Sequence, residues 1–310
     1  MRVAAIDIGT NSVLLTVVER DPAGNECTLL DRATVTRLGQ GVDRTGRLAQ
    51  AAIERTLECL SSYARTLCDV GVDKLAVVGT SALRDAANAE LFTYPATALL
   101  GTTPQVIAGE LEAKLTFRGA LSRLALEGPI LVLDVGGGST EIITGFAASD
   151  GAHAETYRSL DIGCVRLSER YIDSDPPTAS ALAAISENTR AAVAAVESTA
   201  TARQVVAVAG TATTLAAMQL ELEKYDGSKV HGRVISLGDL DALTARLAST
   251  TQAERCHLRG LDPQRADVIV TGGVMLTTLL RVFAQDQVTI SDRGVRYGLI
   301  DELFRNERSF

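Results

Sequence analysis

A short motif occurs twice in this chain of 310 residues, and the repeat is the strongest constraint on its fold. The sequence IDIGTNS at residues 6–12 returns as LDVGGGS at residues 133–139, so the two copies start 127 positions apart. A second pair follows in the same order, because VVGTSA at residues 77–82 is similar to VAGTAT at residues 208–213. Motifs that recur in register indicate an internal duplication, and a chain of this length suits two domains with separate cores.

The hydrophobic pattern of each half predicts a three-stranded meander followed by alternating helices and strands. In the first half, we expect strands at residues 2–8, 12–18, 28–36, 74–78 and 105–108, and helices at residues 48–70, 85–92 and 111–126. In the second half, we expect strands at residues 130–135, 140–145, 154–160, 204–208 and 287–290, and helices at residues 179–196, 212–222, 239–248, 264–283 and 295–304.

This pattern predicts an α/β protein of two domains, residues 1–124 and 125–310. We expect the terminal helix, at about residues 295–306, to pack back on the first domain. The chain starts without a charged leader, and its apolar runs are shorter than the ~18 residues of a membrane span. We therefore expect a soluble, cytoplasmic protein with no membrane partner.

The composition restricts the ligands that such a protein can bind. The formal charge is -8, and aromatic residues make up 4% of the chain with no Trp, which disfavours nucleic acid as a partner. A polyanionic ligand would have to be held by backbone amides, a metal ion and a few placed Arg or Lys side chains. Five cysteines without a C-x-x-C pair indicate reduced thiols in the core rather than disulfides or a zinc site.

The repeated turns place an Asp at the end of a strand, before small residues and Ser. Such a turn can bring backbone N–H groups to an anion while the carboxylate holds a divalent cation. One copy would be better explained as an ordinary glycine-rich hairpin, but two copies in register favour the functional interpretation. Across the second hairpin, Asp134 and Glu141 can come together as hard ligands for Mg²⁺, although a solvated surface Glu141 is an equal alternative.

The Gly-Thr segments lie between a predicted buried strand and the helix that follows it. Gly79 to Ser81 and Gly210 to Thr213 would therefore present N–H groups at a positive helix end, which favours phosphate. Helix capping by Thr or Ser explains the same residues, and both interpretations can hold together.

Five segments resemble the exopolyphosphatase and guanosine pentaphosphate phosphohydrolase family. They are DIGTNS from Asp7, GTSALRDAAN from Gly79, GELEA from Gly109, DVGGGSTE from Asp134 and GTATT from Gly210. The resemblance implies the fold of the actin-like ATPase, sugar kinase and heat-shock chaperone superfamily, in which two ribonuclease H-like domains flank a central phosphate-binding cleft. It extends to SDRGVRYGLIDEL at residues 291–303 and so covers nearly the whole chain.

The resemblance also implies roles for particular residues. Glu112 falls on the catalytic carboxylate, which orients and deprotonates water, and Mg²⁺, or alternatively Mn²⁺, would be held by Asp134, Glu141 and, through water, Asp7. Taken alone, Glu112 would be interpreted as a solvated helix residue. For Arg84, the local sequence favours equally a phosphate-binding residue and a surface residue paired with Asp85 or Glu90. The residues implied in substrate binding are Thr10, Asn11, Ser12, Arg84, Gly136, Gly137, Gly138, Ser139, Gly210, Thr211 and Thr213.

The expected reaction is hydrolysis of the terminal phosphoanhydride of inorganic polyphosphate. Because the chain stops at Phe310, where longer family members continue, we expect a preference for shorter polymers. Guanosine pentaphosphate is the rival substrate. An ATP-dependent kinase is a further alternative, since TGGVM at residues 271–275 resembles a glycine loop of that superfamily, and a non-enzymatic polyphosphate sensor ranks last. The resemblance also implies a homodimer.

Overall fold

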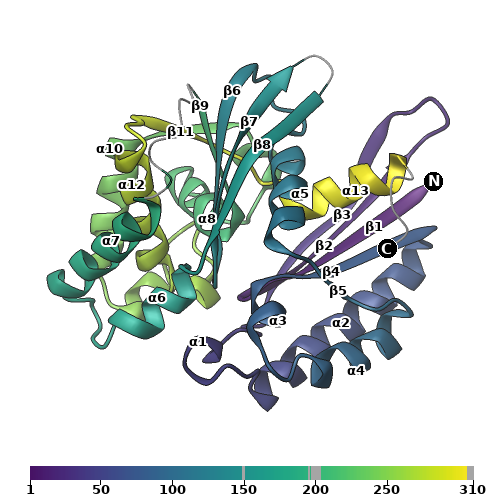
Figure 1. The fold of residues 1–310 in the computed structure, drawn as a ribbon, viewed down its shortest axis with the longest axis horizontal. Coiled ribbons are helices and arrows are strands. Elements are labelled where there is room, and N and C mark those ends of the chain that lie inside the picture. The colour runs from purple at the N-terminus through teal and green to yellow at the C-terminus, as the bar shows by residue number, and fades with distance from the viewer. Residues whose placement is uncertain (149–150, 195, 197–203, 306–310) are drawn as a thin grey trace. The chain divides into compact units, whose positions relative to one another are not determined.

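The computed structural model describes residues 1–148, 151–194, 196 and 204–305, which pack as two compact units (Figure 1). The first unit comprises Met1–Gly119 and the carboxy-terminal segment that begins at Val295. The second unit is Ala120–Gly294. Each unit has its own sheet and its own hydrophobic core, so we describe the two separately.

The first unit contains a five-stranded sheet in the order β3-β2-β1-β4-β5. Its strands are β1 (Arg2–Ile8), β2 (Ser12–Arg20), β3 (Glu26–Val35), β4 (Lys74–Gly79) and β5 (Gln105–Val106). Its helices are α1 (Val42–Thr45), α2 (Gln50–Val70), α3 (Ser81–Asp85), α4 (Glu90–Leu100), α5 (Gly109–Leu121) and α13 (Val295–Arg305), although the last two residues of α5 belong to the second unit.

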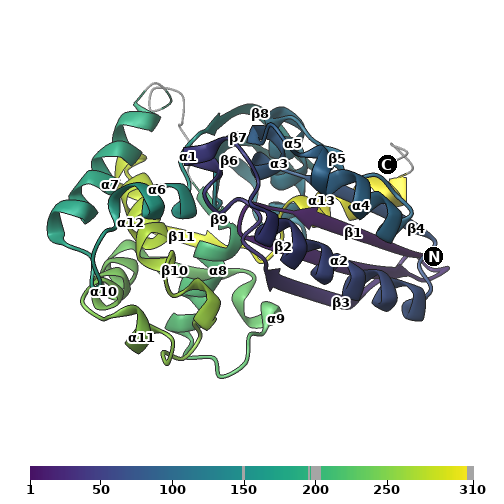
Figure 2. The same cartoon turned by 90° about the horizontal axis from the view of Figure 1, so that it is seen from below.

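The central strand β1 is buried on both faces because its side chains alternate between two cores. Ala4, Ile6 and Ile8 pack with α2 and α4, whereas Val3 and Ala5 pack with α5 and α13. Figure 1 shows α13 next to β1, and Figure 2 shows α2 covering the sheet when the molecule is seen from below. The first unit is therefore a layer of strands between two layers of helices.

The second unit contains a six-stranded sheet in the order β10-β11-β9-β6-β7-β8. Its strands are β6 (Gly128–Val135), β7 (Thr140–Ala148), β8 (Gly151–Leu160), β9 (Gln204–Val208), β10 (Arg233–Ser236) and β11 (Gln287–Ile290). Its helices are α6 (Cys164–Tyr171), α7 (Ala179–Val193), α8 (Ala209–Gln219), α9 (Gly227–Val230), α10 (Leu237–Ala248), α11 (Gln252–Arg255), the 3₁₀ turn η2 (Pro263–Arg265) and α12 (Ile269–Val282).

The two sheets repeat one arrangement, as the duplicated motifs predict. In the first, β1 pairs antiparallel with β2 and parallel with β4. In the second, β6 pairs antiparallel with β7 and parallel with β9. The repeated Asp-Gly turn thus connects a central strand to its antiparallel neighbour, and the repeated Gly-Thr segment follows the parallel neighbour in each unit. The predicted α/β class and the two-sheet organisation are confirmed.

Three predicted helices differ from those in the structure. The helix predicted at residues 85–92 is interrupted between α3 and α4, because the buried Asn88 side chain accepts from Leu48 N and donates to Leu48 O. The helix predicted from residue 264 starts at Ile269, after the 3₁₀ turn that Asp262 caps. The helix predicted at residues 111–126 ends at Leu121.

Besides the four-residue helices α1, α9 and α11, the hydrophobic pattern missed two elements, α6 and β10. The eight-residue helix α6 is too short to show a clear period, and its first amides bind the carbonyl oxygens of a turn far away in the sequence. The edge strand β10 has four residues, of which Ile235 is buried against the core. Both elements owe their stability to tertiary contacts rather than to local pattern.

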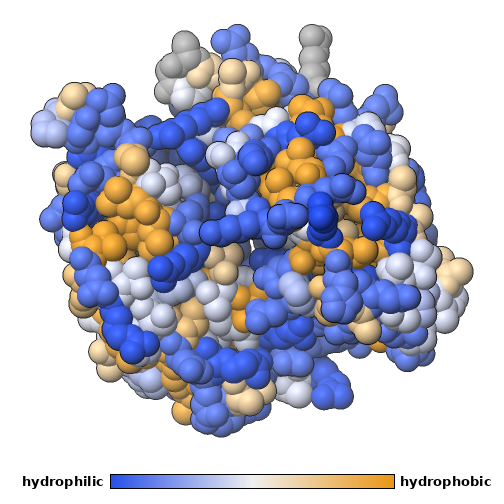
Figure 3. Space-filling view, turned by 180° about the vertical axis from the view of Figure 1, so that it is seen from behind, coloured by the Kyte–Doolittle hydropathy of each residue, from blue (hydrophilic) through white to orange (hydrophobic). Residues whose placement is uncertain are grey.

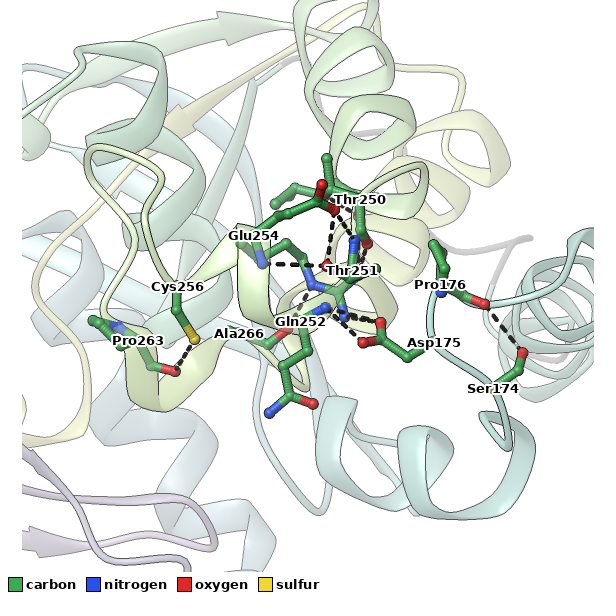
Figure 4. A network of polar contacts seen from close by, with 12 residues as sticks. Ser174, Asp175, Pro176, Thr250, Thr251, Gln252, Glu254, Cys256, Pro263 and Ala266 are labelled. Carbon is green, nitrogen blue, oxygen red and sulfur yellow. Dashed lines mark hydrogen bonds and ion pairs between the residues drawn. The ribbon is translucent and has the colours of Figure 1, made fainter.

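A buried arginine holds the irregular segment between α10 and α12 in place (Figure 4). Arg255, 3% exposed, donates to the carbonyl oxygens of Leu247, Thr250 and Ala266 and pairs with Asp175 at 3.2 Å. Asp175 also accepts from the backbone N–H of Gln252. One guanidinium therefore ties the end of α10 to Thr250 and to the segment before α12.

Most of the face drawn in Figure 3 is hydrophilic, with separate apolar areas between the charged side chains. Among the described residues, none of the helices combines the length and the apolar character needed to cross a bilayer.

Replacing Gly298 by Ala tests how tightly α13 packs on α5. A Cβ atom at Gly298 would lie 2.2 Å from the Leu115 carbonyl oxygen, whereas one at Gly294 would have no atom within 4 Å. We expect Gly298→Ala to lower the free energy of unfolding by about 1–3 kcal/mol and Gly294→Ala to change it by about 0.5 kcal/mol or less. Urea denaturation followed by circular dichroism measures both, and equal effects would contradict this packing.

Removing Arg255 tests the network of Figure 4. We expect Arg255→Leu to lower the free energy of unfolding by about 3–5 kcal/mol, because three backbone carbonyls lose their hydrogen bonds to the guanidinium and Asp175 loses its ion pair. The control is Arg259→Leu, whose exposed pair with Glu223 should contribute about 1 kcal/mol or less. The two variants are compared by denaturation. Equal shifts of their midpoints would show that Arg255 does not stabilise the fold more than an exposed ion pair.

Candidate active site

In the first unit, three parallel strands end at one edge of the sheet. The register pairs Asp7 of β1 with Val78 of β4, and Gly79 of β4 with Val106 of β5. The segments that follow these strands are the Asp-Gly turn, α3 and α5. Ligands in open α/β sheets bind outside the carboxyl ends of the strands, so the fold brings Asp7, Arg84 and Glu112 to the edge where a site is expected.

The Asp-Gly turn of the first unit is fixed through its carbonyl groups. Gly9 N donates to Ser12 O at 3.0 Å, and the Thr10 carbonyl accepts from Gly39 N at 2.9 Å. The Asn11 carbonyl accepts from two further backbone N–H groups, those of residues 36 and 37. Because the C=O and N–H of a trans peptide point in opposite directions, the N–H groups of Asn11 and Ser12 point away from these donors.

The side chain of Thr10 links the Asp-Gly turn to the segment after β4. Its hydroxyl lies 2.8 Å from the hydroxyl of Ser81, and both side chains are buried. A Cβ atom at Gly39 would lie 2.3 Å from Cγ2 of Thr10, so glycine is needed there for the close approach. The two motifs of the first half are thus joined by a direct hydrogen bond.

Glu112 lies in the first turn of α5 and is 6% exposed. Its Oε2 accepts from Nη1 of Arg84 at 2.6 Å, and the same nitrogen donates to Ile107 O at 3.0 Å. Burial raises the pKa of Glu112, while the hydrogen bond and charge of Arg84 act in the opposite direction. A buried carboxylate with a raised pKa is a candidate general base, whereas the solvated Glu of the local sequence reading is wrong.

Arg84 is oriented toward the interior of its own unit. Its side chain is 25% exposed and pairs with Glu112, a partner that the local sequence does not suggest. This geometry fits a residue that positions the carboxylate.

In the second unit, the carboxyl ends of β6, β9 and β11 also lie at one edge. Asp134 of β6 is paired with Val208 of β9, and Ile290 of β11 is paired with Ala207. The glycine turn of residues 136–139 and the start of α8 follow these strand ends. The residues implied in binding from the second half, Gly136 to Ser139 and Gly210 to Thr213, therefore come together at this edge.

Asp134 and Glu141 stand directly opposite each other in the antiparallel pair of β6 and β7. Side chains at such positions share one face, with Cβ atoms about 4.5–5.5 Å apart. Glu141 is 2% exposed, and its Oε1 accepts from Ser159 Oγ of β8 at 2.8 Å. Two fixed carboxylates on one face suit Mg²⁺, which keeps several waters and takes few protein ligands. Within the described residues, no group of three or more potential metal ligands is present.

The start of α8 combines a strained backbone with a nearby positive charge. Ala209 has φ of 67°, a conformation that costs a non-glycine residue about 1–3 kcal/mol and that often marks a functional site. A Cβ atom at Gly210 would lie 1.7 Å from Nη1 of Arg265, so this guanidinium rests on the Gly210 backbone. Arg265 was missed by sequence reasoning, because its segment was predicted as regular helix.

The hydroxyl groups of Thr211 and Thr213, at the start of α8, contact other groups of the protein. Thr213 Oγ1 donates to Ala209 O at 3.1 Å, and Thr211 is 4% exposed, with its hydroxyl against α12 at Gly272. Any anion contact by these residues would therefore be made by their backbone N–H groups at the positive end of the helix.

The TGGVM segment at residues 271–275 lies inside α12 and not in a loop. Gly272 faces Thr211, and Gly273 faces Thr244, with Cβ positions at 2.5 and 2.7 Å from the hydroxyl oxygens of those residues. Close helix packing explains both glycines, so their resemblance to a nucleotide-binding loop of kinases is not supported.

His231 is bound on both ring nitrogens. Nε2 lies 3.0 Å from Ser122 O, and Nδ1 lies 3.3 Å from Ser291 Oγ. Burial lowers the pKa of His231 to about 4, and the charge of Arg293 acts in the same direction. The ring is therefore neutral near pH 7 and ties the end of α5 to the segment after β11 within the second unit.

The chain is similar to known proteins along nearly its whole length. A family model described as the Ppx/GppA phosphatase family matches residues 17–307. Exopolyphosphatase 2 of Mycobacterium tuberculosis is 39% identical to this chain, covering 96% of the chain and 97% of the relative. A guanosine-5'-triphosphate,3'-diphosphate pyrophosphatase of Photobacterium profundum is 30% identical, covering 98% of this chain but 60% of that relative.

A crystal structure is similar over the whole chain. The Ppx/GppA family member of Aquifex aeolicus matches with a TM-score of 0.82 and 33% identity, covering 100% of this chain and 99% of that one.

The neutral His231 predicts a specific dependence of stability on pH. Because its folded pKa of about 4 lies below the ordinary value of 6.5, its contribution is fully present above pH 6.5 and is lost as the pH falls toward 4. We expect the free energy of unfolding to drop less between pH 7 and pH 4 in His231→Gln than in the wild type. Denaturation at a series of pH values measures this difference, and identical slopes would rule it out.

Proposed function

The chain belongs to the Ppx/GppA phosphatase family, and from this premise we propose that it is an exopolyphosphatase that hydrolyses the terminal phosphoanhydride of inorganic polyphosphate and releases phosphate. The observation that carries the proposal is the buried Glu112, held by Arg84 at the carboxyl edge of the first sheet. The similarity to exopolyphosphatase 2 along nearly the full length of both chains supports the choice of substrate.

Glu112 is assigned the role of general base. Its carboxylate accepts a proton from the attacking water, whose oxygen forms a bond to the terminal phosphorus while the bond to the bridging oxygen breaks. Burial favours this role, since the raised pKa makes the carboxylate a stronger proton acceptor. Arg84 fixes the carboxylate through Oε2, and we assign its positive charge to stabilising a non-bridging phosphate oxygen.

Phosphate binding is assigned to backbone amides. In the first unit they belong to residues 10–12, at the start of β2. In the second unit they belong to residues 136–139, before β7, and to residues 210–213, in the first turn of α8. Arg265, resting on Gly210, adds a positive charge to the second group. The overall charge of -8 makes such local donors necessary.

Asp134 and Glu141, which lie in one unit, are assigned to Mg²⁺, with Mn²⁺ as the alternative. When bound, the cation neutralises charge on the non-bridging oxygens. Ser159 holds Glu141 in place for this role.

Guanosine pentaphosphate is the second candidate substrate, because a relative whose name gives this nucleotide, guanosine 5'-triphosphate 3'-diphosphate, is 30% identical over 98% of this chain. Its reacting end is also a terminal phosphoanhydride, so the same residues would act on it. Phosphate release from polyphosphates of defined length, guanosine pentaphosphate and ATP, compared at equal concentration, decides between the two. An ATP-dependent kinase would transfer phosphate from ATP to an acceptor and would not release phosphate from polyphosphate.

The variant Glu112→Gln tests the assigned base. We expect kcat for polyphosphate to fall by about 10²- to 10⁴-fold, with a much smaller change in substrate affinity, because the amide cannot accept the proton. The wild type should lose kcat/KM as the pH falls through the raised pKa of Glu112, and the variant should lack this limb.

The matched control is Glu110→Gln, in the same turn of α5. Glu110 is exposed and pairs with Lys114, so we expect its removal to leave the rate within about twofold of the wild type. A Glu112→Gln protein that retained a tenth or more of the activity would exclude Glu112 as the base.

A further inference from the structure

The carbonyl groups of the glycine turn in the second unit are all turned toward α6. Gly136 O accepts from Cys164 N at 2.9 Å, and Gly137 O accepts from the backbone N–H groups of Val165 and Arg166 at 2.9 and 3.1 Å. These donors are the N-terminal amides of α6, which have no partners inside their own helix. The carbonyl groups of the turn therefore accept hydrogen bonds from the N-terminal amides of α6.

The contact between turn and helix is tight. A Cβ atom at Gly163, just before α6, would lie 2.3 Å from Gly137 O. Gly136 N also donates to Ser139 O at 3.0 Å, which closes the turn at its base. The contact with α6 restricts rotation of the peptide units 136–137 and 137–138.

The orientation of the carbonyls determines where the amides point. In a planar trans peptide, the N–H of one residue is antiparallel to the C=O of the residue before it. With the carbonyls of residues 136, 137 and 138 facing α6, the N–H groups of residues 137, 138 and 139 face away from it. Successive N–H groups directed to one side form a concave binding site for an anion.

The third of these peptide units differs from the first two. The carbonyls of Gly136 and Gly137 bind backbone N–H groups, whereas that of Gly138 accepts from Nε of the Arg166 side chain at 2.8 Å. Gly138 has no Cβ atom to restrict its φ and ψ, so the peptide between Gly138 and Ser139 can rotate at low cost once this bond is removed. A rotated peptide would present a carbonyl oxygen where an N–H group is needed.

We propose that Arg166 is a positioning residue that keeps the Ser139 N–H directed toward the bound phosphate by holding the carbonyl of Gly138. The proposal rests on the phosphate-binding role assigned to the glycine turn. It gives Arg166 a role that depends on a hydrogen bond from Nε, and not on a direct contact between its positive charge and the substrate.

Three substitutions separate the hydrogen bond from the charge. Gln carries its Nε2 donor at the same chain position as Nε of Arg, without the charge. Met places a methyl group at that position and cannot donate. Lys keeps the charge but carries its donor one bond further from the backbone.

We expect Arg166→Gln to retain kcat/KM for tripolyphosphate within about threefold, and Arg166→Met to lose about 10- to 100-fold, up to the scale for removing one oxyanion donor. The salt dependence of KM should be the same in wild type and Arg166→Gln. Thermal denaturation of all three variants shows whether a loss of kcat/KM comes from unfolding. Arg166→Gln and Arg166→Met both lack the charge, so the difference between them reports on the hydrogen bond alone.

Two results would overturn the proposal. Arg166→Met with wild-type kcat/KM would show that the bond to Gly138 has no functional consequence. Arg166→Gln as impaired as Arg166→Met, with Arg166→Lys active, would show that Arg166 acts through its charge.

Binding measurements keep this test separate from the proposed activity. Calorimetric titration of the full chain with tripolyphosphate and Mg²⁺ should show weaker binding for Arg166→Met than for Arg166→Gln. If the wild type binds tripolyphosphate but releases no phosphate, the hydrolase proposal fails while the positioning role is still tested by these affinities. Equal affinities of the Gln and Met variants would refute the positioning role.

Discussion

Parallel pairing of the central strand is the constraint on which the rest of this structure depends. It aligns the carboxyl end of β1 with that of β4, and the carboxyl end of β6 with that of β9. Each sheet thereby gathers an Asp-Gly turn and the segment after the parallel neighbour at one edge. The chemistry assigned to the protein needs both segments. The Asp-Gly turn supplies backbone amides and a carboxylate, whereas the segment after the parallel neighbour supplies the Arg84 side chain in the first unit and a helix N-terminus in the second.

Both Asp-Gly turns use the same means to direct their amides outward. In the first unit, the Thr10 and Asn11 carbonyls bind the segment after β3, and in the second unit the glycine carbonyls bind the start of α6. A protein with a net charge of -8 gains anion affinity in this way without a cluster of basic side chains. The arrangement also explains the glycines at positions 39 and 163, where a Cβ atom would separate the two segments.

Buried polar groups fix the surroundings of each candidate residue. Glu112 is held by Arg84, Glu141 by Ser159, and the segment before α12 by Arg255. Such groups are costly to bury and require good hydrogen-bond geometry, so each holds one side chain or segment in a defined position. Reaction geometry is sensitive to small displacements, which makes these supporting residues as informative as the residues assigned to the chemistry.

The sequence by itself predicted the α/β class, the duplicated succession of strands and the hairpin that carries Asp134 and Glu141, because period-two burial and short hairpins are local properties. It also identified Glu112 through a motif, without indicating that this side chain is buried. Only the tertiary structure decided the partner of Arg84, the break at Asn88, the position of Arg265 on Gly210 and the existence of α6. Each of these depends on hydrogen bonds or contacts between residues distant in the chain, which local propensity does not encode.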